Sequence, residues 1–253
     1  MSVIGIYQQL QTEPGSSAKI AWMASTPLPP VPVVLPDKSL AARLRAGPLE
    51  IFAILLILVT SQFSVAAAAL LAVVWVYLSR TPWHEIGYVR EKKWSASIAI
   101  GVIFGVAFKL VMKAIVMPLL GAPAVIPTFQ EFVHNRAAIP LALLFILAGA
   151  GWGEETLFRG WAFERLGKVF GTTRAAKSAI IAITSVWFGF AHYRVLGIHG
   201  TEQAMIVGFI FAVIFARTGR LFPLMIAHAA YDLTAYAIVY WALEGKIAHL
   251  IFR

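Results

Sequence analysis

Apolar segments of about 20 residues follow one another along most of this chain, and they limit its possible folds more than any other feature. A helix of about this length crosses a bilayer core about 30 Å thick. Apolar residues make up 60% of the 253 residues and charged residues 13%. A soluble domain is about 45–50% apolar and about 25% charged. The sequence therefore predicts an all-α polytopic membrane protein, a bundle of membrane-spanning helices.

The apolar segments and the basic residues between them predict about seven spans. We expect a hairpin of two short helices over Pro48–Leu78, because Thr60-Ser61-Gln62 interrupts a stretch too long for one span. The basic flanks of this hairpin predict that both of its ends face the cytoplasm, and so a cytoplasmic N-terminus in a multi-pass membrane protein. The other expected spans are Trp94–Met117, Ala137–Gly167, Ser178–Tyr193, Ala204–Ala216 and Leu221–Leu243, with an outer turn over Arg194–Gln203.

The first 46 residues differ from the rest of the chain. They include the Pro-rich segment Thr26–Pro32 and lack the basic and apolar regions that open a secretory signal. We interpret residues 1–46 as a disordered cytoplasmic tail and residues 47–253 as the membrane domain. Within that domain, the spacing of Gly101 and Gly105, and of Gly149 and Gly153, predicts close helix packing.

The net charge of +9 comes mostly from basic residues at the ends of apolar segments. Orientation in a membrane explains such residues. No basic stripe with interleaved aromatic residues is present, so membrane lipid is an expected partner and nucleic acid is not. The chain has no cysteine, which excludes disulfides, thiolate catalysis and cysteine-bound metals.

Three charged residues, Glu154, Glu155 and Arg159, lie inside the apolar stretch Ala137–Phe163. Each costs about 2.5–3.5 kcal/mol at mid-bilayer, so such a cluster predicts a functional site. Glu155 and Arg159 share a helix face, while Glu154 lies about 100° away. The arginine can pair with one glutamate while the other faces a cavity, which would separate their proton affinities. The alternative is a buried structural ion pair.

Two further apolar helices carry polar residues four positions apart. Phe188 could wall off a dry side of a site and orient His192. Asp232 could hydrogen-bond His228 and fix its tautomer. Each pattern alone also suits a local structural role. Because six ionisable residues lie on three separate apolar helices, one polar intramembrane cavity explains them together.

These patterns resemble the three motifs of the CAAX protease and bacteriocin-processing family, which includes the type II CAAX prenyl endopeptidases. The resemblance covers roughly Pro140–Trp241. The motifs are Glu-Glu-x-x-x-Arg, Phe-x-x-x-His and His-x-x-x-Asn or Asp, matched by Glu154–Arg159, by Phe188 and His192, and by His228 and Asp232.

The resemblance implies an intramembrane endopeptidase that cuts a plain or lipidated peptide or protein near the cytoplasmic membrane face. Together with the basic inner flanks, it implies a bacterial inner membrane. Glu154 would be the general base, and His192 would help to position the attacking water. His228 and Asp232 would stabilise the oxyanion or complete the site, while Glu155 and Arg159 would shape it and balance its charge. The prenyl proteases carry Asn at the position of Asp232, and an ionised aspartate cannot donate a hydrogen bond.

Metal dependence is a separate question, because many members of this family are labelled metalloproteases. A zinc ion would take nitrogen and oxygen ligands from Glu154, His192 and His228. The sequence contains no His-Glu-x-x-His motif, since His84-Glu85-Ile86-Gly87-Tyr88 lacks the second histidine. We favour glutamate-activated water that needs no cofactor, and zinc is the alternative.

Two other classes of protein compete with a protease. A non-catalytic bacteriocin-immunity or scaffold protein is a role associated with related members. A proton-coupled transporter would also place Glu, Asp and His inside the membrane. The sequence shows no paired discontinuous helices of the kind found in inverted-repeat transporters, which disfavours this second class.

Overall fold

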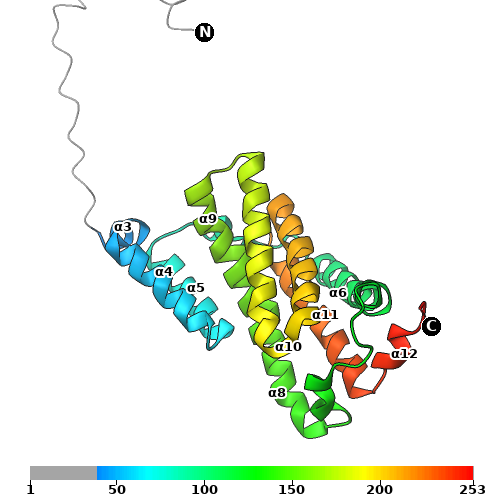
Figure 1. The fold of residues 1–253 in the computed structure, drawn as a ribbon. Helices are drawn as coiled ribbons and strands as arrows, with labels where there is room; N and C mark the ends of the chain where they lie inside the picture. Colours follow the sequence, from blue (N-terminus) through cyan, green and yellow to red (C-terminus); the bar gives the residue numbers. More distant parts are fainter. Residues whose placement is uncertain (1–38, 253) are drawn as a thin grey trace, which may run out of the picture. The chain divides into compact units, whose positions relative to one another are not determined.

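The computed structural model describes residues 39–252, and all regular secondary structure in this range is helical (Figure 1). The predicted tail lies outside the described residues up to position 38, and Leu40–Arg45 of that tail are helical rather than disordered. The α-helices are α3 Leu40–Arg45, α4 Pro48–Ser61, α5 Val65–Leu78, α6 Trp94–Val111, α7 Met117–Leu119, α8 Ile139–Leu144, α9 Ala162–Phe170, α10 Arg174–Thr218, α11 Phe222–Tyr240 and α12 Glu244–Ala248. The other helices are η1 Trp83–Ile86, η3 Pro127–Phe132 and η4 Arg136–Ala138, which are 3₁₀, and η2 Met112–Val116 and η5 Phe145–Trp161, which are π.

Four helical runs within residues 39–252 are long and apolar enough to cross a membrane: Trp94–Leu119, Arg136–Phe170, Arg174–Thr218 and Phe222–Tyr240. The helices α4 and α5 are apolar but shorter. An all-helical protein with several candidate membrane helices is therefore confirmed. The count of seven spans and the orientation are still predictions.

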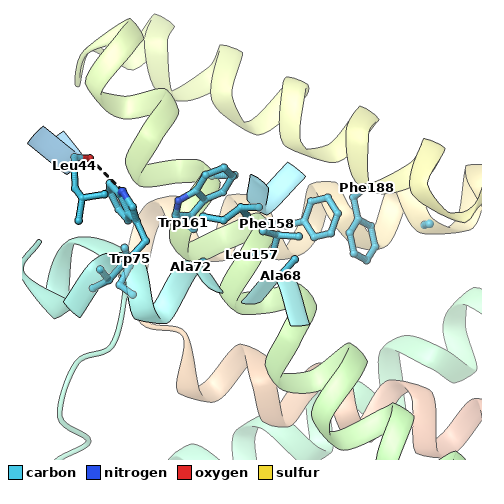
Figure 2. Close-up of a cluster of buried hydrophobic side chains, with 13 residues drawn as sticks. Leu44, Ala68, Ala72, Trp75, Leu157, Phe158, Trp161 and Phe188 are labelled. Atoms are coloured by element: carbon cyan, nitrogen blue, oxygen red, sulfur yellow. Dashed lines mark hydrogen bonds between the residues drawn. The ribbon is translucent and has the colours of Figure 1, made fainter. Parts of the chain in front are cut away.

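The N-terminal hairpin is confirmed as two helices, α4 and α5, with a break between Ser61 and Val65. Ser64 caps α5 by accepting a hydrogen bond from the backbone N–H of Ala67, 3.2 Å away. Small side chains on α5, such as Ala68 and Ala72, are fully buried against η5. Figure 2 shows this contact, in which Leu157, Phe158 and Trp161 of η5 lie beside α5.

The expected long helix over Ala137–Gly167 is present, but its central part η5 is a π-helix, which the sequence analysis did not predict. The backbone N–H of Ala162 bonds to the carbonyl of Leu157, five residues earlier. Such i→i+5 bonding is rare and often occurs at functional sites. The glutamates and the arginine singled out above all lie on this helix.

A kink at Gly197 divides α10 into two antiparallel halves. Gly197 has φ 64° and ψ −162°, a conformation that residues with a Cβ rarely adopt. Gly189 of the first half faces Met205 of the second, and Gly208 faces Phe188, so the halves lie side by side (Figure 1). The expected turn over Arg194–Gln203 is wrong in extent, because one glycine reverses the chain.

Close backbone approach joins α6 to α11. A Cβ on Gly105 would lie 2.2 Å from the carbonyl oxygen of Ala227, and one on Gly101 would lie 2.8 Å from Cγ2 of Ile226. The predicted packing role is therefore confirmed for this glycine pair. Gly153 packs against Ala66 of α5, whereas Gly149 has no neighbour within 4 Å and its predicted packing role is wrong. In the resulting order, α11 packs against both α6 and η5, and η5 also packs against α5.

Candidate active site

Three helices bring the seven singled-out side chains together. The π-helix η5, the first half of α10 and α11 supply Glu154, Glu155 and Arg159, then Phe188 and His192, then His228 and Asp232. The side chains that the sequence predicts to share one site therefore lie close together in the structure. The part that each residue plays in chemistry is still a prediction.

A fully buried chain of charge-assisted hydrogen bonds runs through Glu155. Its Oε1 accepts from Arg159 Nη1 at 2.8 Å and from His228 Nδ1 at 2.6 Å. The side chain of Glu155 is 0% exposed and that of Arg159 is 1% exposed. Partners of opposite charge stabilise both groups inside the protein. The pairing of Arg159 with Glu155, four residues away, leaves Glu154 for another role.

The guanidinium of Arg159 is also held by residues that the sequence analysis missed. Its Nη2 donates to the carbonyl oxygen of Gly208, 3.4 Å away. Its Cζ lies 4.5 Å from the ring centroid of Phe188 and 5.5 Å from that of Phe211, which is close enough for cation–π attraction. No sequence signal could identify the Gly208 carbonyl, because every residue offers one.

Glu154 lies on a different face of η5, between two imidazole rings. Its Oε1 is 4.0 Å from His192 Nε2, and its Oε2 is 3.7 Å from His228 Nε2. The side chain is 16% exposed, and Oε2 accepts no hydrogen bond from any described residue. The two adjacent glutamates therefore differ: Glu155 binds two donors through Oε1 and leaves only Oε2 unpaired, whereas neither oxygen of Glu154 accepts a hydrogen bond from a described residue.

Hydrogen bonds fix the tautomers of both histidines. His192 Nδ1 lies 2.7 Å from the carbonyl oxygen of Phe188, which can only accept, so Nδ1 carries the proton. His228 Nδ1 likewise donates to the Glu155 carboxylate. Both Nε2 atoms therefore face Glu154. That of His228 also lies 3.9 Å from Asp232 Oδ2, too far for a hydrogen bond, so the expectation that Asp232 fixes the tautomer of His228 is wrong: Glu155 does so. The Asp232 side chain is 32% exposed, the most of the three carboxylates in the cluster.

Phe188 lies where a wall of the site was expected. Its ring centroid is 4.7 Å from that of His192 and 6.0 Å from that of His228. On its other side it meets Phe158 edge to face at 5.0 Å, as Figure 2 shows. The ring is 2% exposed, so it excludes water from one side of the imidazoles.

Tyr88, which precedes α6, is a further residue near the site that the sequence analysis missed. Its Oη lies 2.8 Å from Thr156 Oγ1, directly after the two glutamates. Burial raises the pKa of Tyr88, so the phenol stays neutral at physiological pH. This bond fastens η5 to the connection between α5 and α6.

The cluster does not fit a metal ion. Ligands at about 2.0–2.1 Å from a tetrahedral zinc ion lie about 3.3 Å apart. The distances from Glu154 to the two imidazoles are longer, and Glu155 is already bound by Arg159 and His228. No group of three His, Asp or Glu residues within positions 39–252 is arranged to hold a metal. A metalloprotease assignment is therefore not supported.

The fold and the cluster define an all-helical protein with several candidate membrane helices, in which acidic and histidine side chains from three helices meet. Residues 136–234 match the sequence model of a protease family, described as Type II CAAX prenyl endopeptidase Rce1-like. The chain therefore contains a domain of this Rce1-like family, and the matched range includes all seven site residues. Searches among curated proteins and among solved structures gave no match. Family membership suggests a membrane protease, which implies a peptide substrate.

Proposed function

We propose that this protein is an intramembrane endopeptidase in which Glu154 activates the attacking water. One observation carries the proposal: Glu154 lies between two imidazoles and neither of its oxygens accepts a hydrogen bond from a described residue, whereas Oε1 of the fully buried Glu155 is occupied by Arg159 and His228. A general base must have a free acceptor within reach of the proton that it removes.

The first step is attack by water on the scissile carbonyl carbon. Two polar atoms about 4 Å apart can both hydrogen-bond one water at about 2.8 Å. The 4.0 Å between Glu154 Oε1 and His192 Nε2 suits such a water. Glu154 takes one proton from it and His192 accepts a hydrogen bond from the other, so the oxygen is oriented as it bonds to carbon.

The second step expels the leaving amine. The carbonyl oxygen gains negative charge, and a protonated Nε2 of His228 donates a hydrogen bond to it. Glu155 holds the ring of His228 from the opposite side through Nδ1. Glu154 then passes its proton to the amide nitrogen as the C–N bond breaks, which restores the carboxylate.

We further propose that the substrate is a peptide or protein, plain or lipidated, cut near the cytoplasmic face of a bacterial inner membrane. The support is the match to a prenyl endopeptidase family and the candidate membrane helices around the site. No step of this reaction passes through a metal, because Glu154 and the two histidines supply the base, the orientation and the hydrogen-bond donor.

Cleavage of fluorogenic peptides by the detergent-purified protein tests the proposal. We expect wild-type protein to cut at least one of a prenylated and plain set, with or without a chelator. Glu154→Gln removes the base and should lower kcat by about 10²–10⁴-fold. The matched control is Glu202→Gln. Glu202 is partly exposed and pairs with His199, so this variant should cleave peptides as the wild type does. Cleavage that survives in Glu154→Gln would contradict the role of Glu154. Loss of wild-type cleavage in the presence of the chelator would show that the reaction needs a metal ion.

A further inference from the structure

The charges of the site do not balance among its own residues. Three carboxylates, those of Glu154, Glu155 and Asp232, face the Arg159 guanidinium and the imidazolium that His228 forms in the proposed reaction, so one negative charge is left unbalanced. That guanidinium is bound to Glu155 and lies between two phenyl rings. Uncompensated charge inside a membrane is costly, so a second cation near Asp232 is to be expected.

Lys109 on α6 is a buried cation outside the recognised motifs. It is 6% exposed, and its Nζ lies 4.9 Å from the ring centroid of Tyr231, the residue before Asp232. Gly105, one turn earlier, brings the backbones of α6 and α11 together at Ala227. This close approach positions Lys109 against the part of α11 that carries Asp232.

The electrostatic surroundings distinguish Lys109 from its neighbour on the same helix. Lys113 forms an ion pair with Glu244 at 3.5 Å and donates to the carbonyl of Ala124 at 2.7 Å. Lys109 has no direct ion pair among residues 39–252, and its Nζ lies over the ring of Tyr231, directly before Asp232 on α11. Lys113 is thus committed to α12, and the charge of Lys109 is left to act on Asp232.

We propose that Lys109 is a positioning residue whose charge balances Asp232 and holds its carboxylate beside His228. The proposal rests on the proposed endopeptidase function, because that reaction builds negative charge on an oxygen next to His228. With Lys109 present, Asp232 adds little net negative potential there. Without Lys109, the carboxylate opposes the developing oxyanion, so the transition state is destabilised more than substrate binding.

Four variants measured as a cycle test the pair: Lys109→Met, Lys109→Arg, Asp232→Asn and the double variant Lys109→Met/Asp232→Asn. We expect Lys109→Met to lower kcat about tenfold or more with KM little changed. Interaction free energies between residues of one electrostatic network commonly correspond to a change of about this size. Lys109→Arg keeps the charge and should retain activity. Asp232→Asn should recover much of the loss in the double variant, because it removes the charge that Lys109 balanced.

Lys113→Met, alone and with Asp232→Asn, is the matched control. It removes a buried lysine one turn away, so a merely structural role for α6 would make it behave like Lys109→Met. We expect Asp232→Asn to give no recovery in this background. Strictly additive effects of Lys109→Met and Asp232→Asn on kcat would overturn the proposal.

Thermal melting in detergent separates this proposal from the endopeptidase function. Lys109→Met should lower Tm by about 5 °C or more, and Asp232→Asn should reverse part of the fall. This cycle reports the pair whether or not a substrate is cut. If wild-type protein cleaves no peptide but the Tm cycle shows coupling, the enzyme function fails and the coupling of Lys109 to Asp232 stands. Additive Tm changes would refute the pair itself.

Discussion

At the scale of single residues, the two adjacent glutamates have opposite surroundings. Glu155 is fully buried and binds two cationic or proton-donating side chains. Glu154 is partly exposed and keeps a buried oxygen without a donor among the described residues. A buried charge that loses its partner is costly, whereas a free acceptor contributes little to folding. Substitution of Glu155 should therefore lower mainly the stability of the protein, and substitution of Glu154 mainly its activity.

Glu155→Gln should destabilise the protein, because it leaves the Arg159 guanidinium buried without a counter-charge. The expected cost is about 3–5 kcal/mol, a large fall in Tm. Glu154→Gln should melt close to wild type although it is inactive. Differential scanning of both variants in one detergent makes the comparison, and equal falls in Tm would show that the two glutamates share a structural role.

At the scale of helices, the sequence predicts local relations well and contacts between helices poorly. The four-residue spacing of Glu155 and Arg159 already implied their pairing, because neighbours on one helix face must meet. The bond from His228 to Glu155 spans 73 residues, so no local spacing could reveal it.

The π-helical form of η5, and the restriction of the predicted turn over Arg194–Gln203 to a single glycine, escaped prediction for a related reason. A π-helix and an α-helix share the same apolar composition, so periodicity over a short apolar stretch does not separate them. A glycine in a helical stretch reads as tolerated unless its φ is known. Lys109 was overlooked because a single lysine in an apolar span gives no motif, and its partner lies on another helix.

Gly105→Ala should loosen the contact between α6 and α11. The new Cβ would lie 2.2 Å from the Ala227 carbonyl oxygen and 2.9 Å from the Tyr231 nitrogen, which are backbone atoms that cannot turn away. Overpacking of this kind costs about 1–3 kcal/mol, so Tm should fall by several degrees.

The matched control is Gly149→Ala, where the Cβ meets nothing within 4 Å and Tm should not fall. Activity of Gly105→Ala should also drop, since the substitution moves Lys109 away from Asp232. A Tm for Gly105→Ala at or above that of Gly149→Ala would contradict the close contact.

At the scale of the whole molecule, helices outside the matched family domain contribute to the site. The hairpin of α4 and α5 precedes residues 136–234, yet α5 packs along η5, the helix that carries both glutamates. Tyr88, also outside this range, bonds to Thr156 of the same helix. The hairpin is therefore part of the support that holds the site helix in position.

Arg165 joins this hairpin to the family domain. Its Nη1 lies 2.6 Å from Glu50 Oε1 of α4, and its Cζ lies 4.2 Å from the ring centroid of Trp75 of α5. Trp75 in turn donates from Nε1 to the carbonyl of Leu44, 3.1 Å away (Figure 2). The side chain of Arg165 thus contacts both helices of the hairpin from α9, the helix that continues η5.

Arg165→Met should therefore release the hairpin while the rest of the bundle stays folded. Amide hydrogen exchange should rise over α4 and α5, because loss of the ion pair and of the cation–π contact lowers the free energy of local opening. Exchange over α11 should change little. Arg174→Met is the control, since Arg174 is exposed at the start of α10 and makes no ion pair within residues 39–252. Equal exchange rates in the two variants would show that Arg165 does not hold the hairpin, and faster exchange over α11 would show that hairpin and domain unfold as one unit.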